Sequence, residues 1–478
     1  MPLQLYDTLS RGIHPILPED GKTLRFYCCG PTVYGPAHIG NFRTFVMQDI
    51  FRRVVEVGGL ATRHVRNVTD VDDKTIRQSQ EEGRRLSEFT TVWTDRFHKD
   101  CAALGILPPH IEPSAVAHIP EQIDLIAQLM KKGHAYRTPD GSVYYDVRSF
   151  PAYGRLSRLA EREITTDAVD REQDDEYERA SAADFALWKA ARPEDGPNHW
   201  TSPWGNGRPG WHIECSTMAM KQLGESFDLH SGGIDLVFPH HENEIAQSEA
   251  ATGKTFARHW FHVAHLTVDG RKMSKSLGNL YTLDDLANLG HGPMELRYVL
   301  LSGNYRQPLN FTLSSLAASR KALARLSDWQ QRLGGQPDRL PPGEGNFGPF
   351  ASVYEALLSD LNTSEALGRL HSRGREVIAA VKAGELSDQK IEAARHGFAL
   401  VLQSLGLTLP STEHAANAVE KTAPAGIHAL ATERCEARHQ RDWALADQLR
   451  DQIHEAGWVI LDGIDGYTLE AVSEEQSV

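Results

Sequence analysis

Apolar and polar residues alternate along residues 22–30, KTLRFYCCG. This period of two predicts a buried strand that ends at Gly30. Apolar residues then recur at helical spacing over residues 41–59 and stop at a Gly-Gly pair, which predicts a helix. Residues 61–73 are typical of a second strand. A strand, a glycine-containing loop, a helix and a strand make a βαβ unit, which implies a parallel sheet with a ligand crevice at its strand ends.

The α/β pattern is interrupted in the middle of the first 260 residues. Residues 74–133 are mostly helical in pattern, and residues 134–147 predict a β-hairpin around an Asp-Gly turn. The hairpin opens a polar, acid-rich stretch to about residue 195, as an insertion would. The pattern then resumes as a predicted helix, strand and helix over residues 211–224, 226–233 and 240–253.

The chain changes character near residue 311. Three amphipathic helical segments follow and predict a helix bundle. Residues 410–426, PSTEHAANAVEKTAPAG, have the composition of a flexible linker, and residues 427–478 form a small end module with a basic-acidic helix.

Composition narrows the class of protein. The 478 residues carry a formal charge of −14, which argues against a histone-like nucleic-acid binder but leaves room for local basic patches. There is no run of eighteen apolar residues, so we expect no membrane association. An odd, sparse set of cysteines suits a reducing cytoplasm better than a disulfide framework. The cysteines are Cys28, Cys29, Cys101, Cys215 and Cys435.

A candidate metal site involves the segment FPHHENE. His240 and Glu244 stand four residues apart and share a helix face, whereas His241 and Glu244, three apart, are the less favoured pair. Imidazole and carboxylate are zinc ligands, and a tetrahedral site needs two more. Cys29, at a strand end, and Cys215, in HIECS, lie in segments that we place at the same crevice. The alternative is a surface helix that carries His and Glu, with Cys215 as a small core residue.

The other cysteines fit packing roles. Cys28 should face the core, because neighbouring residues on a strand point to opposite faces. Cys101 and Cys435 sit at helical spacing and are expected to pack.

Two further segments suit an anion. The motif HIGN follows a strand and opens a helix, so backbone N–H groups and the helix dipole face the crevice. His38 adds a donor for a phosphate oxygen, and Gly40 permits close approach of a flat ligand. In DGRKMSKSLGN, residues 269–279, Lys272 and Lys275 can neutralise charge on a pyrophosphate leaving group. The alternative for this second segment is a solvated basic loop.

Together these motifs resemble a known family. HIGN followed about 230 residues later by KMSKS resembles the paired signature of class I aminoacyl-tRNA synthetases. Five longer motifs resemble the cysteinyl-tRNA synthetases within that class, over at least residues 20–310. They are CGPTVYGPAHIG, NVTDVDDK, GRPGWHIECS, FPHHENEIAQ and KMSKSLGN.

The resemblance implies an α/β fold with a Rossmann-type catalytic domain and a parallel sheet, interrupted by a connective insertion. An all-α bundle and a small α+β C-terminal module should follow. The implied organisation is the first half of the catalytic domain at 1–133, the insertion at 134–200, the second half at 201–260, the KMSKS loop and stem-contact region at 261–310, the tRNA-binding bundle at 311–409, the linker at 410–426 and the anticodon module at 427–478.

The resemblance also implies roles for single residues. One zinc ion per chain would be held by Cys29, Cys215, His240 and Glu244, and the family's ligand is the cysteine before Gly30, which favours Cys29 over Cys28. The substrate cysteine would bind zinc through its thiolate, with backbone groups held by Thr69, Trp211 and Asp235. ATP, with Mg²⁺, would be bound by His38, Gly40, Asn41, Lys272 and Lys275. His38 and Lys275 would act in catalysis.

The implied activity is ligation of L-cysteine to tRNA(Cys) through cysteinyl-adenylate. Zinc would separate cysteine from serine, because an apolar pocket discriminates such isosteres only about 10²-fold, and we expect no editing domain. We further expect a cytoplasmic monomer. The alternative function is a cysteine ligase of the mycothiol-pathway type that acts on an amino-sugar. One departure from the class-wide signature is Asn41, where histidine is more frequent, and another is the GIDGYTLE ending, where relatives often have a Gly-Thr-Trp-like finish.

Overall fold

The structure is a computed structural model that divides into two compact units, Met1–Leu409 and Pro410–Val478. None of the helices that it describes is long and apolar enough to cross a membrane. The described residues are 2–159, 184–274, 277–337, 346–410, 425–440, 442–463 and 466–471. Lys275 and most of the expected linker lie outside them.

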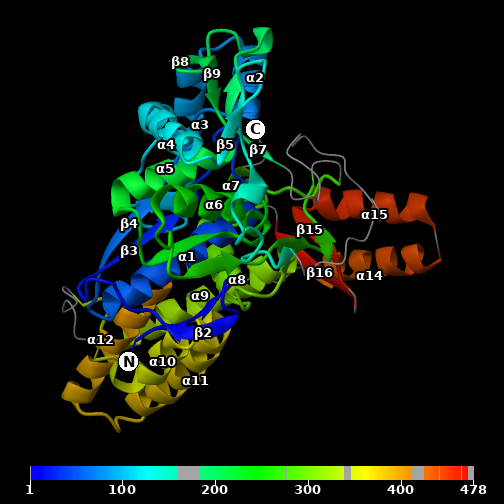
Figure 1. The fold of residues 1–478 in the computed structure, drawn as a ribbon. Helices are drawn as coiled ribbons and strands as arrows, with labels where there is room; N and C mark the ends of the chain where they lie inside the picture. Colours follow the sequence, from blue (N-terminus) through cyan, green and yellow to red (C-terminus); the bar gives the residue numbers. More distant parts are fainter. Residues whose placement is uncertain are drawn as a thin grey trace. The chain divides into compact units, whose positions relative to one another are not determined.

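A four-stranded parallel sheet lies in the first unit, in the order β11-β10-β3-β4. Figure 1 labels its neighbouring strands β3 and β4. Its strands are β3 (Thr23–Cys28), β4 (Ala61–Arg66), β10 (Leu229–Gly233) and β11 (Trp260–Val263). The apolar positions of the first predicted strand, Leu24, Phe26 and Cys28, are fully buried. The predicted parallel sheet is therefore confirmed.

Helix α1 (Ile39–Val57) connects β3 to β4 and is almost entirely buried. One of its sides packs against the sheet, where Phe51 meets Phe26 edge to face at 5.1 Å between ring centroids. The other side meets the bundle, where Tyr354 Oη donates a hydrogen bond to the Val54 carbonyl at 2.7 Å. The sheet, α1 and the bundle thus share one continuous hydrophobic core, which fixes the start of α1 relative to both.

The connection after β4 contains α2 (Asp73–Glu81), α3 (Leu86–Ala103) and α4 (Ile119–Lys131), and then a separate five-stranded sheet. Its order is β5-β6-β7-β9-β8, from β5 (Ala135–Arg137), β6 (Val143–Tyr145), β7 (Phe185–Ala190), β8 (Trp200–Ser202) and β9 (Gly205–Pro209). The sheet runs past residue 200, where we expected the insertion to end, because a tight turn folds β9 back between β8 and β7.

The segments after the insertion return to the central sheet. Helix α5 (Trp211–Leu223) precedes β10, and η5 (Ile234–Val237) and α6 (His240–Thr252) lie between β10 and β11. A three-stranded sheet follows, with β12 (Leu266–Val268), β13 (Arg271–Lys272) and β14 (Leu309–Phe311). Asp269 and Gly270 form the β12–β13 turn with φ of 49° and 74°, the two positive values of a type I′ hairpin.

The helical part of the first unit contains α7 (Leu283–Asn288) and α8 (Pro293–Leu301), followed by the bundle. The bundle helices are α9 (Leu313–Arg332), α10 (Ala351–Leu358), α11 (Thr363–Lys382) and α12 (Asp388–Leu405). Gly374 lets α11 approach α9, because a Cβ there would lie 2.1 Å from the Trp329 ring. A short hairpin, β1 (Gln4–Asp7) with β2 (Gly12–Pro15), begins the chain.

In the described residues of the second unit, two helices pack with a two-stranded antiparallel sheet. Its elements are α14 (Ala425–His439), α15 (Trp443–Glu455), β15 (Trp458–Gly463) and β16 (Gly466–Ala471). Ile427, Ala431, Ile453, Trp458 and Ile460 form its core. This is an α+β arrangement, as predicted for the end of the chain.

Candidate metal centre and nucleotide site

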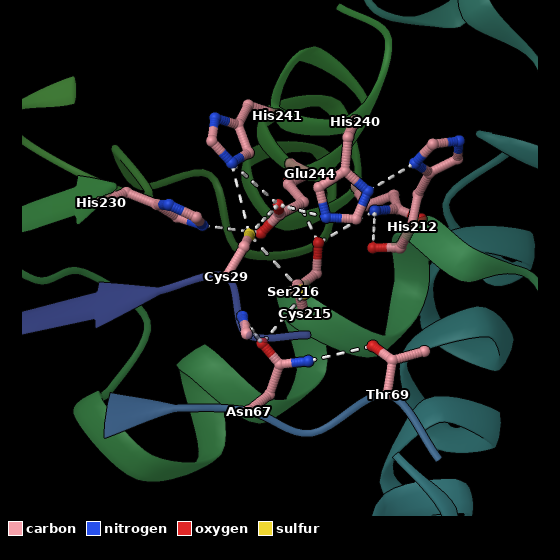
Figure 2. Close-up of polar contacts among 12 residues, drawn as sticks. Cys29, Asn67, Thr69, His212, Cys215, Ser216, His230, His240, His241 and Glu244 are labelled. Carbon is pink, nitrogen blue, oxygen red and sulfur yellow. Dashed lines mark hydrogen bonds and ion pairs between the residues drawn. The ribbon is translucent and has the colours of Figure 1, made fainter. Parts of the chain in front are cut away.

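Four predicted ligands converge at the carboxyl end of the central sheet (Figure 2). Cys29 directly follows β3, Cys215 lies on α5, and His240 and Glu244 lie one turn apart on α6. All four side chains are buried, and their ligand atoms lie within 4.8 Å of one another. The i, i+4 spacing on α6 thus places imidazole and carboxylate beside two thiols from distant segments.

The distances among these atoms fit a tetrahedral zinc ion. The Cys29 and Cys215 sulfurs are 3.9 Å apart, Cys29 Sγ is 3.8 Å from Glu244 Oε1, and His240 Nε2 is 3.1 Å from the same oxygen. Zinc bond lengths of about 2.3 Å to sulfur and about 2.1 Å to nitrogen or oxygen would place these pairs about 3.8, 3.6 and 3.4 Å apart. The donor set, two sulfurs with a nitrogen and an oxygen, also suits zinc chemically.

A second set of donors overlaps the first and consists of Cys29, His230, His241 and Glu244. His241 Nε2 is 3.3 Å from Cys29 Sγ, and His230 Nε2 is 2.9 Å from Glu244 Oε2. The less favoured i, i+3 pair of the sequence is therefore also close to the thiol. The two sets share Cys29 and Glu244; Cys215 and His240 complete the first, and His230 and His241 complete the second.

Charge at this centre is set by burial and by close pairs. Burial opposes ionisation of Glu244, yet His230 and His240 outweigh it and lower the pKa of the carboxyl to about 2. Burial likewise opposes the charge on His240, but Glu244 raises its pKa to about 10. A hydrogen bond from Cys29 lowers the pKa of Cys215 to about 6. The cluster therefore favours a thiolate at Cys215 and a carboxylate at Glu244, the forms that bind a metal ion. Burial raises the pKa of Cys29, and His240 is protonated at pH 7, so these two groups would release protons when a metal ion binds.

Asn67 ties this centre to the predicted substrate residue Thr69. Its Oδ1 accepts from the Gly30 backbone at 2.8 Å and lies 3.7 Å from Cys215 Sγ, while its Nδ2 donates to Thr69 Oγ1 at 3.1 Å. Gly30 allows this approach, because a Cβ there would lie 1.6 Å from the Asn67 carbonyl oxygen. Asn67 was not predicted from the sequence, where its signal was an amide directly after the second strand.

The two other predicted substrate residues flank the centre. The Trp211 ring lies against His240, with 4.2 Å between ring centroids. Asp235 is exposed on η5, and a Cβ at Gly233 would lie 2.3 Å from its Oδ1. Its negative charge acts on His38, where it opposes the lowering of the imidazole pKa by burial. The structure therefore places Trp211 beside the candidate ligand His240 and Asp235 towards the start of α1.

The HIGN motif forms a reciprocal cap at the start of α1. The Asn41 backbone donates to His38 Nδ1 at 3.3 Å, and Asn41 Oδ1 accepts from the His38 backbone at 3.0 Å. Because Nδ1 accepts, the proton of the neutral ring is on Nε2, which can donate to a ligand. Burial lowers the pKa of His38 below its usual 6.5, so the ring is neutral at pH 7.

The described part of the 269–279 segment lies beside this cap. Met273 Sδ is 3.1 Å from the position that a Cβ on Gly40 would take, so Gly40 makes room for the methionine. The Ile39 backbone donates to the Tyr281 carbonyl at 2.9 Å, just after the segment returns. Lys272 is exposed on β13. The two anion-binding motifs of the sequence are therefore neighbours, although Lys275 is outside the described residues.

The packing cysteines behave as expected on the sheet. Cys28 is fully buried in the core on the α1 side, whereas Cys29 packs with Cys215 on the opposite side. Cys101 joins the same core as Cys28, which confirms the packing role predicted for both. Cys435 is half-buried on α14.

Four buried histidines around the metal ligands were not predicted as a group. Besides the contacts above, His241 Nδ1 meets His262 Nε2 at 2.7 Å, and His240 Nδ1 meets His212 Nδ1 at 2.9 Å. Such hydrogen bonds orient the rings of candidate ligands. Their signal in the sequence was histidine in otherwise apolar strands and helices. The four are His212, His230, His241 and His262.

Comparison with known proteins gives family matches along most of the chain. Residues 16–321 match the model of the tRNA synthetases class I (C) catalytic domain, and residues 421–466 match the cysteinyl-tRNA ligase anticodon binding domain. A cysteine–tRNA ligase of Opitutus terrae is 53% identical over 98% of this chain and 99% of its own length. A cysteine–tRNA ligase of Protochlamydia amoebophila is 42% identical over 98% of each.

Solved structures with the same fold are much more distant in sequence. A LeuRS of Agrobacterium radiobacter K84, in a ternary complex, matches with a TM-score of 0.56 and 14% identity over 84% of this chain and 86% of its own. A methionyl-tRNA synthetase of Mycobacterium tuberculosis, in complex with methionyl-adenylate, matches with a TM-score of 0.55 and 13% identity, covering 80% and 89% of the two chains. These likenesses show the class I synthetase fold.

Proposed function

The chain belongs to the cysteinyl-tRNA synthetases, the class I ligases that join cysteine to tRNA, and we propose that it selects cysteine with one zinc ion. The proposed ligands are Cys29, Cys215, His240 and Glu244. The observation that carries this proposal is the set of three interatomic distances, each within about 0.3 Å of tetrahedral zinc geometry. Two thiols also make this set softer than the one with His230 and His241.

Zinc bound there would accept the substrate thiol as a thiolate and leave the neutral hydroxyl of serine unbound. The remaining recognition falls to the protein. Thr69 and Trp211 lie at the ligands, where they can contact the backbone groups of the amino acid. Asp235 supplies the charge that complements its ammonium group. Editing is not needed in this scheme, in keeping with the short insertion.

ATP is proposed to bind at the start of α1. His38 would donate from Nε2 to a phosphate oxygen without carrying charge, and Gly40 and the positive end of the α1 dipole face the same anion. Lys272, with Lys275 and Mg²⁺, would offset charge on the pyrophosphate. Asn41 contributes by holding His38 in its tautomer.

The reaction then needs positioning more than covalent help from the protein. A carboxylate oxygen of cysteine attacks the α-phosphorus of ATP, the new P–O bond forms, and pyrophosphate leaves with the electrons of the broken bond. A ribose hydroxyl of the 3′-terminal adenosine of tRNA(Cys) next attacks the carbonyl carbon. AMP leaves and the hydroxyl proton is released, which completes cysteinyl-tRNA.

The remaining expectations concern partners and setting. We propose that the bundle (311–409) and the end module (427–478) read tRNA(Cys), as the anticodon-domain match supports. That match, together with full-length cysteine–tRNA ligase relatives, disfavours the amino-sugar ligase. We still predict a monomer that works in the reducing cytoplasm, where Cys29 and Cys215 would not be joined in a disulfide.

The test compares two neighbouring cysteines. Cys29→Ser should remove zinc and lower cysteine-dependent ATP–pyrophosphate exchange at least 100-fold, whereas Cys28→Ser, a matched change one residue away, should keep one zinc per chain. Charging of tRNA(Cys) by the wild type completes the assay. Exchange without charging would favour the amino-sugar ligase, and full zinc content in Cys29→Ser would refute the proposed ligand set.

The same zinc measurement distinguishes the two candidate histidine ligands. His240→Gln should lose zinc, and His241→Gln should keep it. The reverse result would move the site to the set that contains His230 and His241.

A further inference from the structure

Arg43 connects α1 to the small sheet that contains Lys272. The side chain is 1% exposed, on the second turn of α1. Its guanidinium donates to three backbone carbonyls: to His265 through Nη1, and through Nη2 to Asn304 at 3.1 Å and Gln307 at 2.6 Å. One side chain therefore holds two segments that are about 40 residues apart in sequence.

These carbonyls lie at the base of the β12–β14 sheet. His265 directly precedes β12, and Asn304 and Gln307 belong to the turn before β14. Strand β12 pairs in parallel with β14 and antiparallel with β13, where Thr267 stands opposite Lys272. Fixing His265 to α1 therefore also fixes the strand that ends in Lys272.

The path from α1 through this sheet returns to α1. Lys272 is followed by Met273, which contacts Gly40, and the chain comes back at Tyr281, whose carbonyl accepts from Ile39. The start of α1 thus contacts the chain at Met273 and again at Tyr281. Arg43, one turn further along α1, holds the base of the β12–β14 sheet. This closed path of contacts connects the HIGN cap to the strand that ends in Lys272.

Stability alone does not account for a buried arginine at this position. Among the described residues no carboxylate lies within ion-pairing distance of Arg43, and its Nε has no hydrogen-bond partner. Burial lowers the pKa of the guanidinium to about 10, which shows the desolvation that the charge suffers. An apolar side chain would avoid that cost. The arginine offers instead a rigid fork of donors that reaches three carbonyls at once.

Another arginine of the same core shows the contrast. Arg297 is also fully buried and donates to the carbonyls of Leu405 and Leu104, both at 2.9 Å. It pairs in addition with Asp49 at 2.5 Å. Its contacts join α1 to α8, to the end of α3 and to α12, and none of them is with the β12–β14 sheet. Arg297 is therefore a matched control for a buried arginine with a structural role.

We propose that Arg43 is a positioning residue for the activation step, holding the strand that ends in Lys272 in place against the HIGN cap. The inference rests on the proposed function, because it assumes that ATP binds between these two motifs. A displacement of about 1 Å between groups that orient a reactant lowers the rate by about 100-fold. Loss of the fork should thus slow adenylate formation without touching the cysteine-selecting centre.

The test uses the full-length enzyme with Arg43→Gln, Arg43→Lys and the control Arg297→Gln, assayed at a temperature at which each is folded. We expect Arg43→Gln to lower kcat for ATP–pyrophosphate exchange or raise the KM for ATP, with a combined loss of 10- to 100-fold. The KM for cysteine and the zinc content should stay within twofold of the wild type. Arg43→Lys should recover part of the loss, and Arg297→Gln should lower Tm and leave the kinetics within twofold.

Transfer to tRNA from preformed cysteinyl-adenylate, measured in a single turnover, provides a second readout. It should be unchanged in Arg43→Gln, because that step no longer uses ATP.

Several outcomes would overturn the inference. Arg43→Gln with exchange kinetics within twofold of the wild type would do so, as would equal losses in activation and transfer. If Arg43→Gln does not fold, Arg43→Lys decides, and failure of both to fold would make Arg43 structural and end the proposal. Absence of exchange in the wild type would instead refute the proposed function, which keeps the two failures distinct.

Discussion

Replacing Gly30 by alanine tests whether the metal centre depends on close approach of two backbone segments. A Cβ at Gly30 would lie 1.6 Å from the carbonyl oxygen of Asn67 and 2.7 Å from its carbonyl carbon. Real Cβ contacts do not fall below 3.0 Å, so the segments after β3 and β4 must separate by about 1.4 Å. Both clashing atoms belong to the backbone, so no side-chain rotation relieves the contact.

That separation is large for this site. Gly30 adjoins Cys29, and its N–H donates a hydrogen bond to Asn67 Oδ1. The Nδ2 of Asn67 in turn donates to Thr69 Oγ1 and orients that side chain. Metal–ligand distances tolerate about 0.2 Å, and misplacement of about 1 Å in a positioned reactant costs about 100-fold. We therefore expect Gly30→Ala to bind well under one zinc per chain and to lose at least about 100-fold in kcat/KM for cysteine activation. Overpacking should also lower stability by about 1–3 kcal/mol.

The assay measures bound zinc, ATP–pyrophosphate exchange and thermal unfolding of the purified enzyme. Gly35→Ala is the matched control, because it makes the same change in the same loop where a Cβ meets nothing within 4 Å. It should resemble the wild type in all three measurements. If Gly30→Ala keeps one zinc per chain and its kcat/KM stays within threefold of Gly35→Ala, the close-approach reasoning is refuted.

Two further predictions concern side chains away from the metal ligands. Asn41→Ala removes one half of the cap on α1, so the free energy of unfolding should fall by about 1 kcal/mol, measured as a lower Tm. The KM for ATP should also rise in exchange assays. An unchanged KM would show that His38 is held without the Asn41 side chain. Among the described residues neither ring nitrogen of the buried His64 has a hydrogen-bond partner, and burial, aided by Arg66 and Arg52, lowers its pKa well below 6.5. Below pH 6.5 the imidazole of His64 therefore binds a proton in the unfolded chain but not in the folded chain, so the free energy of unfolding falls as the pH falls. His64→Phe, which removes both buried polar atoms, should raise the free energy of unfolding by about 1 kcal/mol and flatten its decline between pH 6.5 and 5 in denaturant titrations; an unchanged slope would contradict this.

The sheet and the ligand pairs were predictable because their signals are local. Alternation in residues 22–30 shows that Cys28 and Cys29 face opposite sides, and the structure places them in two different cores. The i, i+4 spacing of His240 and Glu244 puts both on one helix face, and both are buried beside Cys29. Periodicity fixes the direction of a side chain, which is what these predictions required.

Contacts between distant segments were not predictable in this way. Asn67 was missed because its partners, Gly30 and Cys215, are 37 and 148 residues away. Arg43 was missed for the same reason, since an arginine in an amphipathic helix is normally exposed and only the fold brings three carbonyls to it. The continuation of the five-stranded sheet beyond residue 200 was not predictable either, because β9 pairs with β7 across residues that have no strand pattern of their own. The choice between His240 and His241 also depends on the tertiary surroundings.

Asn41 can replace the more frequent histidine of the class-wide signature because of what the cap requires. The cap needs an acceptor for the His38 backbone N–H, and the Asn41 carbonyl oxygen provides it at 3.0 Å. In return the Asn41 backbone occupies His38 Nδ1, which leaves the proton on Nε2. A histidine at this position would add a ring that can become a cation, but the acceptor role needs only one lone pair. In the proposed ATP site, charge for the phosphates would then come from lysines such as Lys272, which is the reason to test how its strand is held against α1.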